Sequence, residues 1–164
     1  MNKVSKRMSV LSVLLVTLLF LTSACKANIS RNGDGSFTVE TTITQQELQE
    51  VITASIADPL VKELTVSLQS GYALVSGERQ RLNDSSKTDT LSFRLDLSAA
   101  NGQLTSSISN AQLDDIIVEQ DRVDLWNQTI SNRLAILGQK NKKSTLQSVS
   151  ITPDIVTMTW NVVR

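Results

Sequence analysis

Few residue types in this sequence could carry out catalysis. The chain of 164 residues contains no histidine and a single cysteine, Cys25. Without histidine, serine–histidine and cysteine–histidine catalysis, histidine general bases and histidine-bound metal ions are excluded. A Walker loop, a Gly-x-Gly-x-x-Gly segment and a serine-centred nucleophile elbow are absent as well. We therefore expect a protein that is not an enzyme and that requires no cofactor.

Carboxylates could still act as catalytic groups. Five of them are close in sequence: Asp114, Asp115, Glu119, Asp121 and Asp124. A hydrolase that uses only carboxylates is the alternative to consider. However, these residues lie where a helix is expected to begin, and acidic side chains in a first turn stabilise the helix dipole. We favour the structural interpretation and predict no catalytic residue here.

A loop-like segment, Asn32-Gly33-Asp34-Gly35-Ser36, resembles the start of an EF-hand loop. In an EF-hand the twelfth position is a bidentate glutamate and a helix precedes the loop. The twelfth position here would be Thr41, and no helix is expected before the segment. A tight turn before a strand explains these residues, so we predict no metal site.

The N-terminus has the organisation of a bacterial export signal. Lys3, Lys6 and Arg7 precede an uncharged apolar run that ends in small residues before Cys25. The segment Leu21-Thr22-Ser23-Ala24-Cys25 resembles a lipobox, although its third position before the cysteine is Thr22 where leucine is usual. We predict that residues 1–24 are a signal peptide and that Cys25 is the lipid attachment site.

Two other readings of Cys25 remain open. Cys25 is either an unmodified thiol behind an ordinary signal peptide, or part of an N-terminal segment that stays uncleaved as an anchor. The lipidated reading is favoured because a lone cysteine cannot form an internal disulfide, and an exposed thiol in an exported protein is reactive. Several acyl chains on one cysteine give a stable membrane anchor. We expect a cell-membrane or cell-envelope protein, held on the extracytoplasmic face.

The rest of the chain fits one domain. We expect a lipidated tether at residues 25–36 and a single globular domain at residues 37–164, of ordinary domain size. Removal of the leader takes away three of the 16 basic residues and none of the 16 acidic ones, which leaves 13 against 16. The resulting net charge near minus 3 argues against nucleic acid as a partner.

Hydrophobic periodicity predicts two helices among several strands. Thr44-Gln45-Gln46-Glu47 is a capping box, and the helix that follows should stop at Asp58-Pro59. A second helix should run from Asp121 to Gly138. The apolar residues on one stripe of that helix are Val123, Trp126, Ile130, Leu134 and Leu137.

Alternating residues predict strands around these helices. Hairpins are expected at Ser70-Gly71, at Asn101-Gly102 and at Pro153-Asp154, with a further strand around residues 112–118. The predicted order is β-α-β-β-β-β-(β)-α-β-β. Strands grouped apart from helices indicate an α+β fold, and we expect one curved antiparallel sheet of about six to eight strands packed on or around the two helices, preceded by the signal helix.

The order of these elements resembles a family of small bacterial extracytoplasmic proteins, the phospholipid-binding mannan-elongation lipoprotein-like group of mycobacteria. The resemblance covers residues 37–164 and includes the Thr-x-x-Glu-Leu helix start from Thr44 to Leu48 and the glycine-centred turns. It implies a sheet wrapped on a helix, as in tubular lipid-binding modules, with an apolar groove for an acyl chain. It assigns no functional residue, since it rests on element order.

Two functions are compatible with these observations. The first is binding of lipid or another apolar ligand, with a groove lined by Val51, Ile52, Trp126, Ile130 and Trp160; a continuous apolar tunnel would favour it. The second is a surface module that recruits an envelope protein through an exposed sheet edge or a polar face. A filled core with a patch of exposed apolar residues would favour the second.

Overall fold

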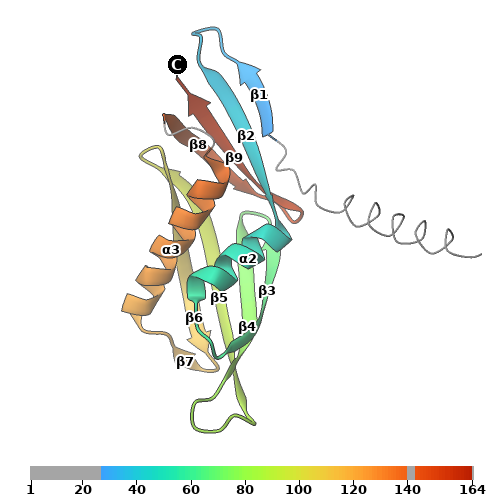
Figure 1. The fold of residues 1–164 in the computed structure, drawn as a ribbon, viewed down its shortest axis with the longest axis vertical. Coiled ribbons are helices and arrows are strands. Elements are labelled where there is room, and N and C mark those ends of the chain that lie inside the picture. Colours follow the sequence, from blue (N-terminus) through green and yellow to red (C-terminus); the bar gives the residue numbers. More distant parts are fainter. Residues whose placement is uncertain (1–26, 140–142, 164) are drawn as a thin grey trace, which may run out of the picture.

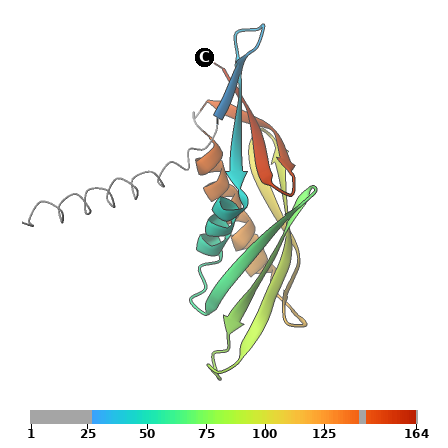
Figure 2. The same ribbon diagram turned by 90° about the vertical axis from the view of Figure 1, so that its right-hand side faces the viewer.

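The computed structural model describes residues 27–139 and 143–163 and confirms the α+β class. Two antiparallel sheets and two helices make up this part of the chain. The helices lie side by side and cover one face of the larger sheet (Figures 1 and 2). The predicted signal peptide of residues 1–24 and its cleavage site before Cys25 lie outside the described residues. Within the described ranges, neither helix is both long and apolar enough to cross a membrane.

The larger sheet has five strands in chain order. They are β3 (Val61–Gln69), β4 (Tyr72–Gln80), β5 (Thr88–Ala100), β6 (Gln103–Leu113) and β7 (Ile116–Ile117). The β5–β6 turn has positive φ at both Asn101 (53°) and Gly102 (75°), which a two-residue type I′ turn requires. Both predicted hairpins in this sheet are confirmed. The strand expected around residues 112–118 is shorter, because its first two residues belong to β6.

The smaller sheet has the order β1-β2-β9-β8. Its strands are β1 (Ala27–Arg31), β2 (Phe37–Thr44), β8 (Ser144–Ile151) and β9 (Ile155–Val162). The segment predicted as a tether therefore contains a strand, and Ala27 already pairs with Thr41. The predicted turn lies between β1 and β2, where Asp34 Oδ1 accepts hydrogen bonds from the Ser36 N–H and hydroxyl. This turn folds β1 back onto β2.

The two sheets meet at hairpin ends, which differs from the single continuous sheet that was predicted. The Leu146 N–H donates to the Gly102 carbonyl at 2.8 Å, and the Gly71 N–H donates to the Ile151 carbonyl at 3.0 Å. Strand β8 thus crosses the tips of the β5–β6 and β3–β4 hairpins. Because it lies across these tips and does not run along a strand, no ladder connects the sheets.

Helix α2 (Gln45–Ile56) begins and ends as predicted. The Thr44 hydroxyl accepts from the Glu47 N–H, and the Glu47 carboxylate accepts from the Thr44 N–H, so that the capping box is complete. Ala57 adopts a left-handed conformation immediately before Asp58-Pro59 and ends the helix. The capping box and Ala57 therefore fix the two ends of the helix.

Helix α3 (Gln120–Gly138) buries most of the predicted stripe, with one exception. Val123, Trp126, Ile130 and Leu134 are buried, whereas Leu137 is 39% exposed. The next inward position is taken by Gly138, where an added Cβ would lie 2.4 Å from the Met158 methyl carbon. Close packing against β9 thus requires glycine at the inner position, and Leu137 points outward.

Side chains of the two helices bond to backbone N–H groups along both sides of the five-stranded sheet, on the edge strand β3 and on the part of β6 that β7 does not cover. On the β3 edge, the Val66 and Leu68 N–H groups donate to the side-chain carbonyls of Gln49 (3.2 Å) and Gln45 (3.4 Å). The β6 edge is bonded in the same way to α3, through residues 127 and 131. Because these backbone groups already have partners, they are not available to pair with a strand from another chain.

Candidate functional site

The five residues predicted to line an apolar groove belong to the core. Ile52 and Ile130 are fully buried, and Val51, Trp126 and Trp160 are at most 9% exposed. Val51 also borders an open groove on the outer side of the helices, and Trp160 borders a separate pocket beside the β5–β6 turn. The predicted lining therefore does not form one continuous surface.

Both tryptophans have partners inside the protein. Trp126 packs against Phe93 of β5, with 6.0 Å between the ring centroids. The indole N–H of Trp160 donates to the buried Thr41 hydroxyl at 3.0 Å. The space beside Trp126 measures about 20 Å³, which is room for roughly one water molecule. The interior is therefore filled around Trp126, and an acyl chain would have to displace side chains to enter there. Trp160, although buried, borders a pocket of about 360 Å³ between α3, the β5–β6 turn and β8.

An open groove runs between α2 and α3, on the side away from the sheet. It has a volume of about 450 Å³. We call it the interhelical groove, and it is lined by Glu47, Glu50, Val51, Ala54, Arg133, Ile136 and Leu137. Four of these residues are apolar and three are charged, so the groove offers apolar contact area beside charged side chains.

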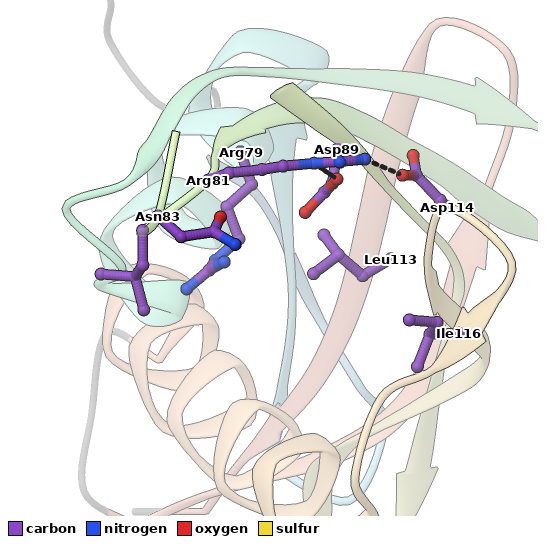
Figure 3. A pocket seen from close by; sticks show the side chains of 8 residues that line it. Arg79, Arg81, Asn83, Asp89, Leu113, Asp114 and Ile116 are labelled. Atoms are coloured by element: carbon purple, nitrogen blue, oxygen red, sulfur yellow. Dashed lines mark hydrogen bonds and ion pairs between the residues drawn. The ribbon is translucent and has the colours of Figure 1, made fainter. Parts of the chain in front are cut away.

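A second pocket lies at the far end of the molecule from β1, where the β4–β5 loop meets the β6–β7 turn (Figures 1 and 3). Its volume is about 370 Å³. We call it the distal pocket, and its lining consists of Arg79, Arg81, Leu82, Asn83, Asp89, Leu113, Asp114 and Ile116. Figure 3 shows Arg81 lying across the pocket toward Asp89 and Asp114, with Leu113 and Ile116 beside it.

The charged groups of the distal pocket are held in ion pairs, one of them with Asp58 outside the pocket. Arg79 Nε lies 2.8 Å from Asp58 Oδ2, and Arg81 bonds to Asp89 and reaches Asp114 at 3.4 Å. The Thr90 N–H donates to the Asp114 carboxylate, which with the nearby Arg81 holds the pKa of that carboxyl below its usual range. Partial burial by itself would raise the pKa of Asp58, but the bonds from Arg79 and the Leu60 N–H outweigh it and lower that pKa.

This pairing limits the chemistry of the pocket. A guanidinium that already binds two carboxylates would have to exchange them to bind an anionic ligand, and an ionised carboxylate is a poor general acid. The ion pairs instead connect the β4–β5 loop to the β6–β7 turn. What the pocket offers to another molecule is its apolar surface.

Apolar side chains stand exposed around this pocket. Leu82, Ile116 and Ile117 are 82%, 73% and 77% exposed. Leu82 and Ile116 border the distal pocket, while Ile117 borders the adjoining surface next to α3. We call these three residues the distal patch. Their exposure is unusual for isoleucine and leucine, which are among the residues most often buried.

The acidic residues that are close in sequence do not form one site, because each has a different structural role. Asp114 occupies the β6–β7 turn with a φ of 52°, and Asp124 accepts a hydrogen bond from Gln120 within α3. Asp121 lies in the first turn of α3, where it stabilises the helix dipole. Across residues 27–139 and 143–163, no group of histidine, cysteine or acidic residues has an arrangement that could hold a metal ion.

Sequence reasoning missed both the distal patch and the groups that close the sheet edges. Leu82 lies in a polar loop and Ile116-Ile117 in a short apolar run, so each looked like an ordinary loop or strand. The edge-closing groups carried a weak signal, since Gln45 and Gln49, like Asn127 and Ser131, are four residues apart and flank an apolar stripe.

In a comparison with known proteins, no family model, no curated protein and no solved structure matches the chain.

Proposed function

We propose that this chain is a lipid-anchored extracytoplasmic module that recruits a protein partner through the distal patch, without catalytic activity. The observation that carries this proposal is the contrast between a filled interior around Trp126 and three exposed apolar side chains at one end. A small ligand in the distal pocket would leave these side chains largely in water. A protein surface can cover Leu82 and Ile116 together, because both border the distal pocket beside Arg81, and arginine is enriched at protein interfaces.

The membrane anchor in this proposal is supported by the N-terminal sequence. It predicts that the chain isolated from bacterial membranes begins at Cys25 and carries diacylglycerol, as measured by intact mass. A Cys25→Ser variant should remain unprocessed and unlipidated. A wild-type mass equal to that of the full 164-residue chain would contradict the anchor.

Photo-crosslinking in intact cells tests the distal patch. A photoreactive amino acid at Ile116 should give an adduct of defined mass, and Leu82→Asp should abolish that adduct while protein levels stay unchanged. The matched control is the same photoreactive residue at Leu74, an apolar residue 45% exposed on β4 away from the patch. Equal adducts at both positions, or none at Ile116, would contradict the proposal.

The interhelical groove favours a second candidate function, binding of lipid or another apolar ligand. Its volume of about 450 Å³ lies in the range of small-molecule sites. Native mass spectrometry should then detect a bound lipid that is lost in Ile136→Asp but kept in Leu74→Asp. A lipid-free mass in all three proteins would exclude this candidate and leave recruitment of a protein.

A further inference from the structure

We propose that the outer face of α2 and α3 lies on the same bilayer that holds the lipid of Cys25, so that the protein is fixed to the membrane at two points. We call this face, consisting of Ala54, Leu125, Ile136 and Leu137, the outer helical face. The inference rests on the lipid anchor of the proposed function. It names the surface that meets the membrane, which the anchor alone does not.

The link between the anchor and the folded domain is very short. Only Lys26 separates Cys25 from Ala27, and Ala27 is already paired with Thr41 in the β1–β2 ladder. A link of two residues reaches at most about 7 Å. A lipidated Cys25 would therefore hold the start of β1 at the membrane surface.

The start of β1 lies on the helical side of the molecule. Thr41, the partner of Ala27, is three residues before Thr44, which caps α2. In both views the beginning of β1 is next to the end of the helical layer, and Figure 2 shows the five-stranded sheet on the opposite side. A bilayer that reaches Ala27 thus meets the helices before it meets the sheet.

The outer helical face has the surface that such a contact requires. Leu125 and Ile136 are 61% and 77% exposed. They are eleven residues apart, which is about three helical turns, so they lie on one line along α3 roughly 16 Å in length. Thr129 and Asn132, the residues between them on this line, carry no charge. Two exposed apolar residues separated by uncharged ones allow α3 to lie flat at the lipid interface.

A bilayer fits this face better than a second protein does. The anchor places the face within reach of lipid at all times, whereas a protein would have to displace that lipid. The charges near the face are of both signs, with Arg133 on α3 and Glu50 on α2. Binding should therefore depend on apolar contact and not on anionic lipid. The distal patch, at the other end of the molecule from β1, remains uncovered (Figure 1).

A single-site fluorescent label can test this orientation in the full lipoprotein. Once Cys25 carries lipid, an introduced cysteine is the only thiol in the chain. An environment-sensitive label at Ile136→Cys, in phosphatidylcholine vesicles that contain nitroxide-labelled lipid, should shift to the blue and lose most of its emission. Ser107→Cys, on the exposed side of β6, should keep its emission. Leu125→Cys should behave like Ile136→Cys, which guards against a local effect of one substitution.

The possible outcomes distinguish a wrong orientation from a missing lipid anchor. Equal emission at positions 107 and 136 in a chain shown by mass to be lipidated would overturn the orientation alone. An unlipidated chain would overturn the anchor and the orientation together. A blue shift that grows with protein concentration, without quenching by lipid, would indicate a second copy on this face and would also overturn the inference.

Discussion

Both sides of α3 carry large apolar residues, but in opposite environments. Its inner side presents Trp126, Ile130 and Leu134, all buried against β strands. On its outer side Leu125 and Ile136 are largely exposed, although both are as apolar as the inner residues. The inner residues are explained by packing within the chain. Because the described parts of the chain do not cover the outer residues, these are available for contact with another molecule.

The distal end differs from the interior in another way. The interior is stabilised by apolar packing, whereas the β4–β5 loop and the β6–β7 turn are connected by Arg81 and its two carboxylates. Hydrophobic burial does not depend on pH, but ion pairs do. The two regions should therefore respond differently to mutation and to acid.

The largest expected effect separates the two sides of α3. Leu134→Ala should lower the free energy of unfolding by about 2 to 5 kcal/mol, because it leaves a cavity in the core. Ile136→Ala, two residues away, should change it by less than about 0.5 kcal/mol. Urea unfolding followed by tryptophan fluorescence measures both. Similar losses for the two variants would show that the outer side is also packed, which would remove the basis for a docking face.

The packing at the end of α3 should be nearly as sensitive. Gly138→Ala places a methyl group against Met158 and Trp160, and we expect a loss of about 1 to 3 kcal/mol from overpacking, even though alanine favours a helix. Gly33→Ala serves as the control, since no atom lies within 4 Å of the added carbon. A neutral Gly138→Ala, measured in the same unfolding experiment, would mean that Met158 moves aside at no cost.

Closure of the β6 edge should make a smaller contribution. Asn127→Ala leaves the Ile108 N–H without its partner, which should cost about 1 to 2 kcal/mol. Gln128→Ala changes the exposed neighbour on the same helix and should be neutral. Hydrogen exchange at Ile108 provides a direct readout, because its amide should exchange faster in Asn127→Ala only. Unchanged exchange would show that this bond does not protect the edge.

The smallest effect is the acid sensitivity of the distal end. The pKa of Asp58 and of Asp114 is lowered in the folded protein, so their bonds stabilise it above the unfolded pKa of about 3.9 and are lost as pH falls through the folded values. The melting temperature should decrease as the pH falls below about 4, and Asp58→Asn should reduce that decrease at the expense of stability at neutral pH. An identical pH profile for wild type and Asp58→Asn would contradict this role of the Asp58–Arg79 pair.

Local signals in the sequence were sufficient to predict most of the fold. The capping box at Thr44 and the Asn101-Gly102 turn involve only neighbouring residues, so their geometry does not depend on the rest of the chain. The separation of apolar and polar residues at helical or strand period identified the inner faces, because that period follows from backbone geometry. The fold class and the order of elements from β2 onward derive from these local rules. The same rules identified Val51, Ile52, Trp126, Ile130 and Trp160 as inward apolar positions, but the prediction that they line a groove was wrong, because they are buried in the core.

Only the tertiary structure decided whether those apolar positions enclose a space. Strand β8 crosses the hairpin tips and divides the sheet in two, Gly138 takes the inner position that Leu137 was expected to occupy, and Phe93 fills the space beside Trp126. Each of these contacts joins residues far apart in the chain. A repeating pattern predicts which side of a helix or strand is apolar. The neighbouring elements determine whether that side is covered within the chain, borders a cavity or stays exposed to another molecule.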